Sequence, residues 1–244
     1  MRDCNGFVVP GQSAAEYLHA QGIRESEIFV APNAVDNDLF SDAAAEARRS
    51  EAANRAQLNL HTRYFLFVGR LVREKGVFEL ISAYAKLDQS LRRDFGLVFV
   101  GDGPCRQELE KQARSISPGD VEFVGFMQRE ELAKYYALAH ALVLPTYTDT
   151  WGLVVNEAMA CGLPVILSDV AGCAQDLLEN NKNGLLVPSK NEDALADAMS
   201  NLSTRPDLCR EMGAASAKRI ESHSPKQWSN GVSRAVQSLV RTDD

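Results

Sequence analysis

Short apolar runs recur along the chain from residue 64 onward, and helical patterns separate most of them. The runs cover residues 65–68, 97–100, 121–124, 141–144, 165–167 and 185–187. Each run is continuous rather than alternating, as expected for strands that are buried on both faces. Strands of this kind that alternate with helices predict an α/β fold with a doubly wound parallel sheet, similar to a Rossmann fold.

The first 60 residues carry a weaker pattern. Residues 7–9 and 28–30 are predicted strands, and Ser13 is placed to cap a helix between them that ends at Gly22. Two strands and one helix cannot bury a core alone, so we expect this segment to need a packing partner. Residues 41–60 are rich in alanine and charge, and they predict an exposed connecting helix or linker.

A last helix is predicted from Ser224, where a cap residue is followed by Pro225 and, two positions later, by Gln227. It carries an apolar stripe of Trp228, Val232, Val236 and Leu239. We therefore divide the chain into residues 1–40, 41–60, 61–223 and 224–244, with the parallel sheet in the third segment.

Ligands of doubly wound sheets bind beyond the carboxyl ends of the strands. After the strand at 65–68, a short loop carries Arg70 and Lys75, which together could hold a diphosphate and offset its charge. A solvated basic loop is the other interpretation, and it stays open from these residues alone.

The loop after the strand at 141–144 is polar and leads into a helix that starts near Trp151 or Gly152 and ends at Gly162. A helix N-terminus at the end of a strand offers free backbone N–H groups and partial positive charge, which suits a phosphate. Gly152 would let a ligand approach the backbone closely.

Two carboxylates, Asp149 and Glu157, bracket this helix start. At about 1.5 Å of rise per residue, their carboxyl groups should lie roughly 10 Å apart. Carboxylates that act on one glycosidic bond are about 5 to 9.5 Å apart, so that role is doubtful for this pair. We interpret the two carboxylates as contacts with opposite ends of one elongated ligand. The alternative is that Asp149 only caps the helix and Glu157 is an ordinary helical glutamate.

Other motifs are weaker. Gly101-Asp102-Gly103 lacks the third glycine of a dinucleotide fingerprint, since Arg106 stands there, so a tight turn is the better interpretation. Asp36-Asn37-Asp38 has the Asp-x-Asp form of some metal-dependent enzymes, but we read it as a turn. His140 stands beside a predicted core strand, which indicates a structural role.

Composition narrows the class of protein. The chain has 244 residues, of which 45% are hydrophobic and 24% charged, and its net charge of -7 argues against a broad nucleic-acid footprint. The five cysteines show no paired or metal-like spacing, which fits a reducing compartment. Since no apolar run approaches the length of a membrane span, we expect a cytoplasmic protein, with peripheral contact with the inner face of the membrane left open for the full-length form.

Five segments, in order, carry a resemblance to a known family: VGRLVREKG, VGDGP, VEFVGF, LVLPTYTDTWGLVVNEAMACGLPVILSD and NGLLVP. Together they resemble the nucleotide-sugar-binding domain of glycosyltransferase family 4 (group 1), retaining enzymes with the two-domain GT-B fold. The resemblance runs from about Phe7 to the C-terminus. It implies the C-terminal half of a GT-B fold, with residues 1–40 as a remnant of the N-terminal acceptor domain and residues 224–244 as a crossover helix.

The resemblance also implies residue roles. The family carries two glutamates separated by seven residues where this chain has Asp149 and Glu157, so Asp149 is a departure, as is Asp176 at another position that is often glutamate. Asp149 would hold the donor sugar, Glu157 the ribose, and Arg70 with Lys75 the diphosphate. Further contacts with the donor are implied for Gly69, Gly103, Phe126, Met127, Trp151, Gly152, Leu153 and Val154, with Phe126 and Met127 near the base.

The implied reaction is retaining transfer of a hexose from a nucleotide diphosphate sugar, UDP favoured over GDP, to an acceptor hydroxyl in bacterial polysaccharide or glycoconjugate synthesis. No metal or other cofactor is implied. An acceptor glycan or lipid-linked sugar would bind through the missing domain, so the isolated chain should be inactive or nearly so. The alternatives are a non-catalytic nucleotide-sugar-binding module, a subunit completed by a separate acceptor-binding protein, and the same fold used for epimerisation or phosphorolysis. The exposed ends could also support self-association.

Overall fold

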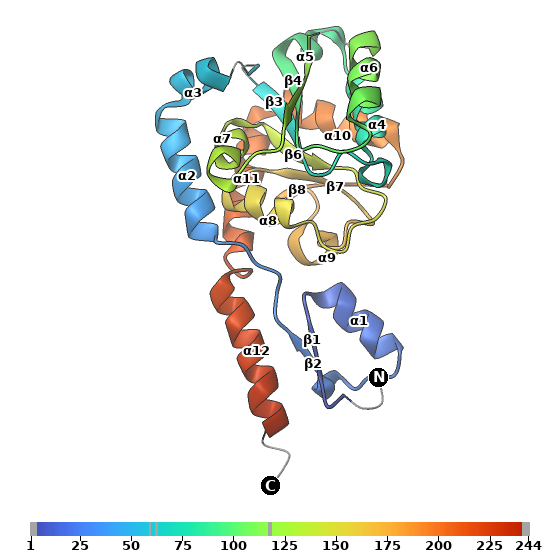
Figure 1. Cartoon of the computed structure of the whole chain (residues 1–244), viewed down its shortest axis with the longest axis vertical. Helices are drawn as coiled ribbons and strands as arrows, with labels where there is room; N and C mark the ends of the chain where they lie inside the picture. The colour runs from blue at the N-terminus through green and yellow to red at the C-terminus, as the bar shows by residue number, and fades with distance from the viewer. Residues whose placement is uncertain (1–3, 59, 62, 117–118, 241–244) are drawn as a thin grey trace.

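The computed structural model describes residues 4–58, 60–61, 63–116 and 119–240. In these ranges the chain forms a large α/β domain and a smaller unit of two strands and one helix, which Figure 1 shows below the domain. The hydrophobic core lies around the sheet of the large domain.

Six parallel strands form the central sheet, in the spatial order β5-β4-β3-β6-β7-β8. They are β3 (Arg63–Val68), β4 (Phe95–Val100), β5 (Val121–Gly125), β6 (Ala141–Leu144), β7 (Val165–Ser168) and β8 (Gly184–Val187). The six strands predicted from the apolar runs and the doubly wound parallel sheet are confirmed. The chain progresses outward from β3 in one direction and from β6 in the other, so the strand order reverses between these two neighbours.

Helices cover both faces of the sheet (Figure 1). They are α4 (Val77–Ala85), α5 (Gln89–Asp94), α6 (Arg106–Ile116), α7 (Arg129–Leu138), α8 (Leu153–Ala160), α9 (Ala174–Leu177), α10 (Glu192–Thr204) and α11 (Pro206–Ile220), with a 3-10 turn η2 (Arg73–Lys75). Helix α4 packs against α6 and α10, and α8 packs against α7 and α11. Across the described ranges, no helix combines the length and the apolar character that a bilayer crossing requires.

The segment predicted to be an exposed connecting helix is helical and most of its residues are exposed, but one face of its first half is buried. It forms α2 (Asn37–Arg49) and α3 (Glu51–Leu58), and α2 packs against α7 and α8. Phe40, Ala44 and Ala47 recur at helical spacing and are buried. The helix and its exposed face are as predicted, and the prediction is wrong only for Ala44 and Ala47, whose small side chains let α2 pack closely on the domain.

The Asp-x-Asp motif begins this helix rather than forming a turn. The Asp36 side chain accepts a hydrogen bond from the Leu39 N–H at 3.1 Å, and Asn37 and Asp38 are the first helical residues. Asp36 therefore satisfies a free donor of the first helical turn.

The smaller unit pairs β1 (Phe7–Val9) in parallel with β2 (Ile28–Val30), joined by α1 (Gln12–Ala20) and a 3-10 turn η1 (Glu25–Glu27). Both strands and the helix were predicted, but Ser13 does not cap α1. Gly11 is the N-cap residue, and the Gln12 N–H donates to Asp176 Oδ1 of the large domain at 2.7 Å. The cap therefore comes from a residue far away in the sequence.

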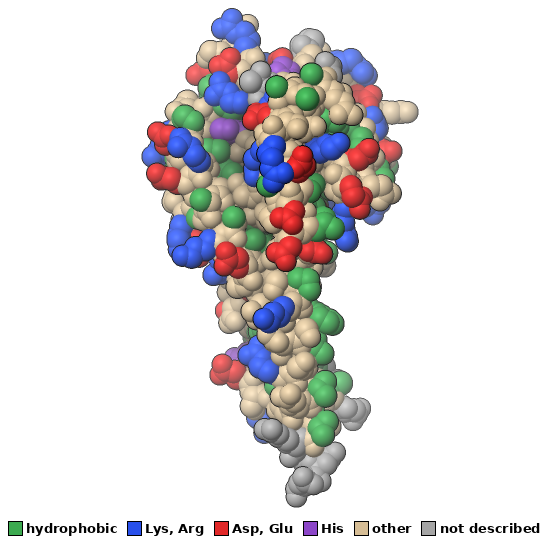
Figure 2. Space-filling view, turned by 90° about the vertical axis from the view of Figure 1, so that its left-hand side faces the viewer, with side chains coloured by type: hydrophobic (Ala, Val, Ile, Leu, Met, Phe, Trp, Pro, Cys, Tyr) green, Lys and Arg blue, Asp and Glu red, His purple; other side chains and the backbone are tan. Residues whose placement is uncertain are grey.

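Helix α12 (Pro225–Val240) packs against both strands of the small unit. Its predicted start is confirmed, because Ser224 Oγ accepts a hydrogen bond from the Gln227 N–H at 3.4 Å. The buried face contains Gly231 and Ala235, whereas Trp228 and Val236 of the predicted stripe stay about half exposed, at 49% and 55%. Figure 2 shows hydrophobic side chains along one edge of the narrow part that α12 and the small unit form.

Replacing Gly231 with alanine should loosen α12 from the small unit. An added Cβ would lie 2.4 Å from the Val30 carbonyl oxygen and 2.6 Å from Ala31 Cα, so the backbone would have to move. In a free helix, replacing glycine with alanine would stabilise the helix by about 1 kcal/mol. Here the added methyl group would overpack the contact between α12 and β2, which costs about 1–3 kcal/mol. We expect faster amide hydrogen exchange in α12 and β2. The exposed Ser233→Ala change is the control, and equal exchange in both variants would contradict the prediction.

Candidate functional site

The loops that follow β3 and β6 contact each other at the carboxyl edge of the sheet. The Glu74 carbonyl oxygen accepts two hydrogen bonds, from the Tyr147 N–H at 2.7 Å and from Thr146 Oγ1 at 2.9 Å. Gly76 has φ +66°, and a Cβ there would lie 2.1 Å from the Pro145 carbonyl oxygen. Since the strand order reverses between β3 and β6, these loops flank the crevice in which doubly wound sheets bind ligands.

An ion pair between Lys75 and Asp149 also joins the two loops. It is largely shielded from solvent, since 24% of the Lys75 side chain and 10% of the Asp149 side chain are exposed. Asp149 Oδ1 accepts a hydrogen bond from the Trp151 N–H at 3.2 Å, so Asp149 also shapes the turn before α8. Asp149 does not cap α8, whose N-cap residue is Gly152, so the interpretation of Asp149 as only a helix cap is not confirmed.

Helix α8 begins beside this ion pair. Gly152 has φ +94°, and Leu153 and Val154 are the first helical residues, with Leu153 45% exposed. The helix ends just before Gly162, which has φ +72°, as the sequence predicts. The Val155 N–H donates to the Gly152 carbonyl oxygen at 2.9 Å, which leaves the N–H groups of Leu153 and Val154 without an acceptor within the helix, so this end carries partial positive charge toward the crevice.

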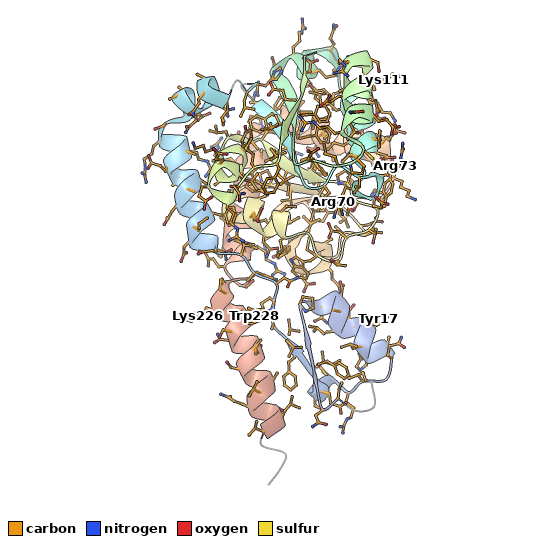
Figure 3. The ribbon with its side chains drawn as sticks, viewed as in Figure 1. Tyr17, Arg70, Arg73, Lys111, Lys226 and Trp228 are labelled. Atoms are coloured by element: carbon orange, nitrogen blue, oxygen red, sulfur yellow. The ribbon has the colours of Figure 1, made fainter. Side chains whose placement is uncertain are left out.

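Arg70 places a second cation in the loop after β3 (Figure 3). Its side chain is exposed and makes no ion pair within the described part of the chain. Arg73, three residues later, binds the Glu108 carboxylate at 2.7 Å instead. Of these two arginines, only Arg70 is therefore free to meet an anion.

Gly69 and Gly103 lie where the loops after β3 and β4 meet. A Cβ on Gly103 would lie 2.5 Å from the Leu71 carbonyl oxygen, and one on Gly101 would lie 2.0 Å from the Gly69 carbonyl oxygen. Gly103 thus leaves room for the Leu71 backbone, and Gly101 leaves room for the Gly69 carbonyl. These packing roles are separate from the donor contacts that the resemblance implies for Gly69 and Gly103.

Phe126 and Met127 follow β5. Phe126 is 72% exposed, and Met127 is half-buried against the core. The exposed Phe126 ring offers a flat surface on which a planar ligand group can stack.

Glu157 lies in α8 and has a partner that the sequence reasoning missed. The hydroxyl of Tyr136, in α7, donates to Glu157 Oε2 at 2.8 Å. Burial raises the pKa of Glu157, and the Tyr136 hydrogen bond opposes that rise. One sequence feature could have indicated this contact, namely a tyrosine on an otherwise apolar helix face. A buried phenol hydroxyl usually needs a hydrogen-bond partner.

The predicted donor contact of Trp151 is not supported. The indole is only 5% exposed, and its Nε1–H donates to Asn156 Oδ1 at 2.9 Å. Asn156 in turn donates to the Asn33 carbonyl oxygen at 3.0 Å. The backbone N–H of Trp151 is engaged by Asp149, so Trp151 supports the loop rather than facing the crevice.

His140 has the structural role that the sequence indicates. Its ring packs edge-on against Phe65 and Phe95, and Nε2 lies 3.0 Å from the Leu202 carbonyl oxygen. Burial lowers the pKa of His140, which keeps the ring neutral within the core. It lies at the edge of the sheet where β6 begins, away from the crevice.

The chain is similar in sequence to curated glycosyltransferases. The chain is 36% identical over 182 residues to an alpha-D-kanosaminyltransferase of Streptomyces kanamyceticus, covering 74% of this chain and 46% of that protein. It is 36% identical over 228 residues to a D-inositol 3-phosphate glycosyltransferase of Nocardiopsis dassonvillei, covering 90% of this chain and 50% of that protein. The chain thus spans about half the length of these curated relatives.

The fold also matches a solved structure, Anabaena HepE in complex with UDP, with a TM-score of 0.80 and 21% identity. That match covers 97% of this chain and 65% of the other. The family model described as glycosyl transferases group 1 matches residues 49–219, which include both loops of the crevice, α8 and the Tyr136–Glu157 pair. The chain belongs to the group 1 glycosyltransferase family.

Proposed function

We propose that the chain binds a nucleotide diphosphate sugar and provides the donor half of a retaining hexosyltransferase. The acceptor would be a hydroxyl of a glycan or lipid-linked sugar in bacterial polysaccharide or glycoconjugate synthesis, bound mainly by a domain beyond this chain. A cytoplasmic place of action is part of the proposal.

One observation carries the proposal: the crevice where the strand order reverses joins cations, a helix N-terminus and a carboxylate. Lys75 and Asp149 pair across it, Arg70 is unpaired within the described residues, and α8 begins beside it. This set suits a ligand with a diphosphate in the middle and hydroxyl groups at an end.

The chemistry follows from charge. As the bond between sugar and diphosphate breaks, negative charge grows on the leaving diphosphate. Arg70, Lys75 and the N–H groups at the start of α8 would stabilise that charge through positions fixed before the reaction. Sugar hydroxyls would donate to Asp149 and ribose hydroxyls to Glu157. No protein nucleophile and no metal are assigned in this scheme.

We favour UDP over GDP as the nucleotide. The structural neighbour HepE is described in complex with UDP, and the exposed Phe126 ring could stack on either base. Asp149 is one methylene shorter than glutamate, so the choice of sugar could differ from that of relatives with glutamate there.

A non-catalytic donor-binding subunit, completed by a separate acceptor-binding protein, is the second candidate. The observation that favours it is that the groups assigned to the donor, among them Lys75, Asp149 and the start of α8, all lie within this chain, so it could bind the donor without supplying acceptor groups.

Calorimetric titration of UDP, GDP, UDP-sugars and uridine tests the donor proposal. Arg70→Ala should weaken UDP binding by roughly 10- to 100-fold, because a hydrogen bond to a charged group contributes about 1.5–3 kcal/mol. Uridine, which lacks the diphosphate, should bind the variant and the wild type alike. Arg73→Ala is the matched control, since Glu108 holds that side chain. Equal loss in both variants, or no nucleotide binding by the wild type, would refute the proposal.

The isolated chain should bind the donor and transfer no sugar. The acceptor would lack its binding surface, so the entropy of bringing both substrates together would not be offset. Release of UDP from a UDP-sugar, with and without sugar acceptors, measures this after calorimetry has verified binding. Transfer by the chain alone would contradict it, whereas activity restored by a separate partner protein would support the second candidate.

The buried carboxylate of Glu157, which would receive the ribose, should lower the stability of the fold at neutral pH. Burial raises the folded-state pKa of Glu157, so the stability from its bound proton is complete below the unfolded pKa. That contribution is lost as the pH rises through the folded pKa. Glu157→Gln stays neutral and keeps an acceptor for Tyr136. Its melting temperature should therefore exceed that of the wild type at pH 7–8, and the gap should shrink toward pH 4.

The matched control for this pH dependence is Glu211→Gln, at an exposed position of α11. Its melting-temperature difference from the wild type should not change with pH. A Glu157→Gln variant that is less stable than the wild type throughout this range would show that the buried carboxylate is a net stabilising group.

A further inference from the structure

We propose that Tyr136 is a positioning residue for nucleotide recognition, holding one oxygen of the Glu157 carboxylate so that the other faces the ribose. The inference rests on the proposed function, in which Glu157 receives the ribose hydroxyls. Tyr136 touches neither the donor nor the reacting atoms in this scheme, and it acts only through Glu157.

The geometry divides the carboxylate into two unlike oxygens. Oε2 accepts the hydrogen bond from the Tyr136 hydroxyl at 2.8 Å. Oε1 accepts no hydrogen bond from any described residue, and it is not a buried, unsatisfied atom. One oxygen is therefore anchored in the core, and the other is left to a ligand.

Other buried tyrosines show that this arrangement is not required for packing. Tyr64 and Tyr84 are as fully buried as Tyr136, and each donates to a backbone carbonyl, of Tyr135 at 2.7 Å and of Phe95 at 2.6 Å. A backbone acceptor satisfies a phenol without burying part of a carboxylate. Only Tyr136 of these three donates to an ionisable side chain at the candidate site.

The anchored oxygen has two consequences for binding. It fixes the side-chain rotamer of Glu157 before the nucleotide arrives, so less conformational entropy is lost on binding. It also favours the ionised carboxylate, because the phenol donates to the charged form. An ionised Oε1 accepts hydrogen bonds from ribose hydroxyls more strongly than a neutral carboxyl does.

The fold keeps the two partners aligned. Helices α7 and α8 contact each other, and α2 packs against both. Within that contact the ring of Tyr136 lies edge-on to Phe40 of α2, with centroids 6.2 Å apart. Phenylalanine at position 136 would keep this ring contact and lose only the hydroxyl, so it isolates the hydrogen bond to Glu157.

The test compares UDP with 2′-deoxy-UDP and 3′-deoxy-UDP by calorimetry on the wild type, Tyr136→Phe and Tyr84→Phe. The wild type should prefer UDP over at least one deoxy analogue by on the order of tenfold. Tyr136→Phe should weaken UDP binding by about the same factor and leave the deoxy analogue that lacks the contact unchanged within about twofold. Tyr84→Phe, which also loses a buried hydroxyl, should keep the wild-type preference.

A second measurement separates positioning from general damage. In Tyr136→Phe the ionisation that controls UDP affinity should move to higher pH, because the charged form of Glu157 loses a donor. Circular dichroism verifies that each variant is folded. Equal weakening of all three nucleotides, or no change in any, would overturn the role of Tyr136 while leaving donor binding intact. A wild type that binds UDP without discriminating the deoxy analogues would overturn the ribose role of Glu157, and that of Tyr136 with it.

Discussion

The close contact between the loops after β3 and β6 is the constraint on which the candidate site depends. Gly76 leaves no room for a Cβ against the Pro145 carbonyl, and the residues on either side of this contact carry the chemistry. Glu74 receives two hydrogen bonds from the opposite loop, and Lys75 pairs with Asp149. A side chain at position 76 would separate the loops and break all three links. The glycine is therefore a condition for the charge arrangement, although it takes no part in binding.

The same loop is tied to the small unit. Trp151 contacts Asn156, which donates to the Asn33 carbonyl oxygen in the segment that leaves β2. A Cβ on Gly11 would lie 2.7 Å from the Trp151 ring, so the start of α1 rests directly on this indole. Asp176 lies against the same point and accepts a hydrogen bond from the Gln12 N–H at the start of α1. The orientation of the small unit and the conformation of the crevice loop therefore depend on one set of buried contacts, and a change at Trp151 would disturb both.

The sheet could be predicted because strands buried on both faces leave continuous apolar runs, and the start of α8 because Gly152 follows a polar loop. The resemblance to family members added roles for Arg70 and Glu157 that spacing alone left open. What the sequence could not show depends on contacts between distant segments. The docking of Ala44 in α2 rests on α7 and α8, and the Tyr136–Glu157 bond joins two helices. Trp151 was assigned to the ligand because a tryptophan in a binding loop gives no sign of which way its ring turns.

The charges in the crevice explain how the affinity for a nucleotide could depend on whether a sugar is attached to it. Lys75 is neutralised by Asp149, so Arg70 and the start of α8 are the groups left to attract a diphosphate. A bound diphosphate that drew on Lys75 would leave Asp149 near negative charge unless another donor replaced the ammonium. Sugar hydroxyls can do so, whereas a bare nucleotide cannot. Under the proposed function Asp149 thus favours the complete donor over the spent nucleotide, because the same carboxylate that recognises the sugar opposes an unaccompanied diphosphate.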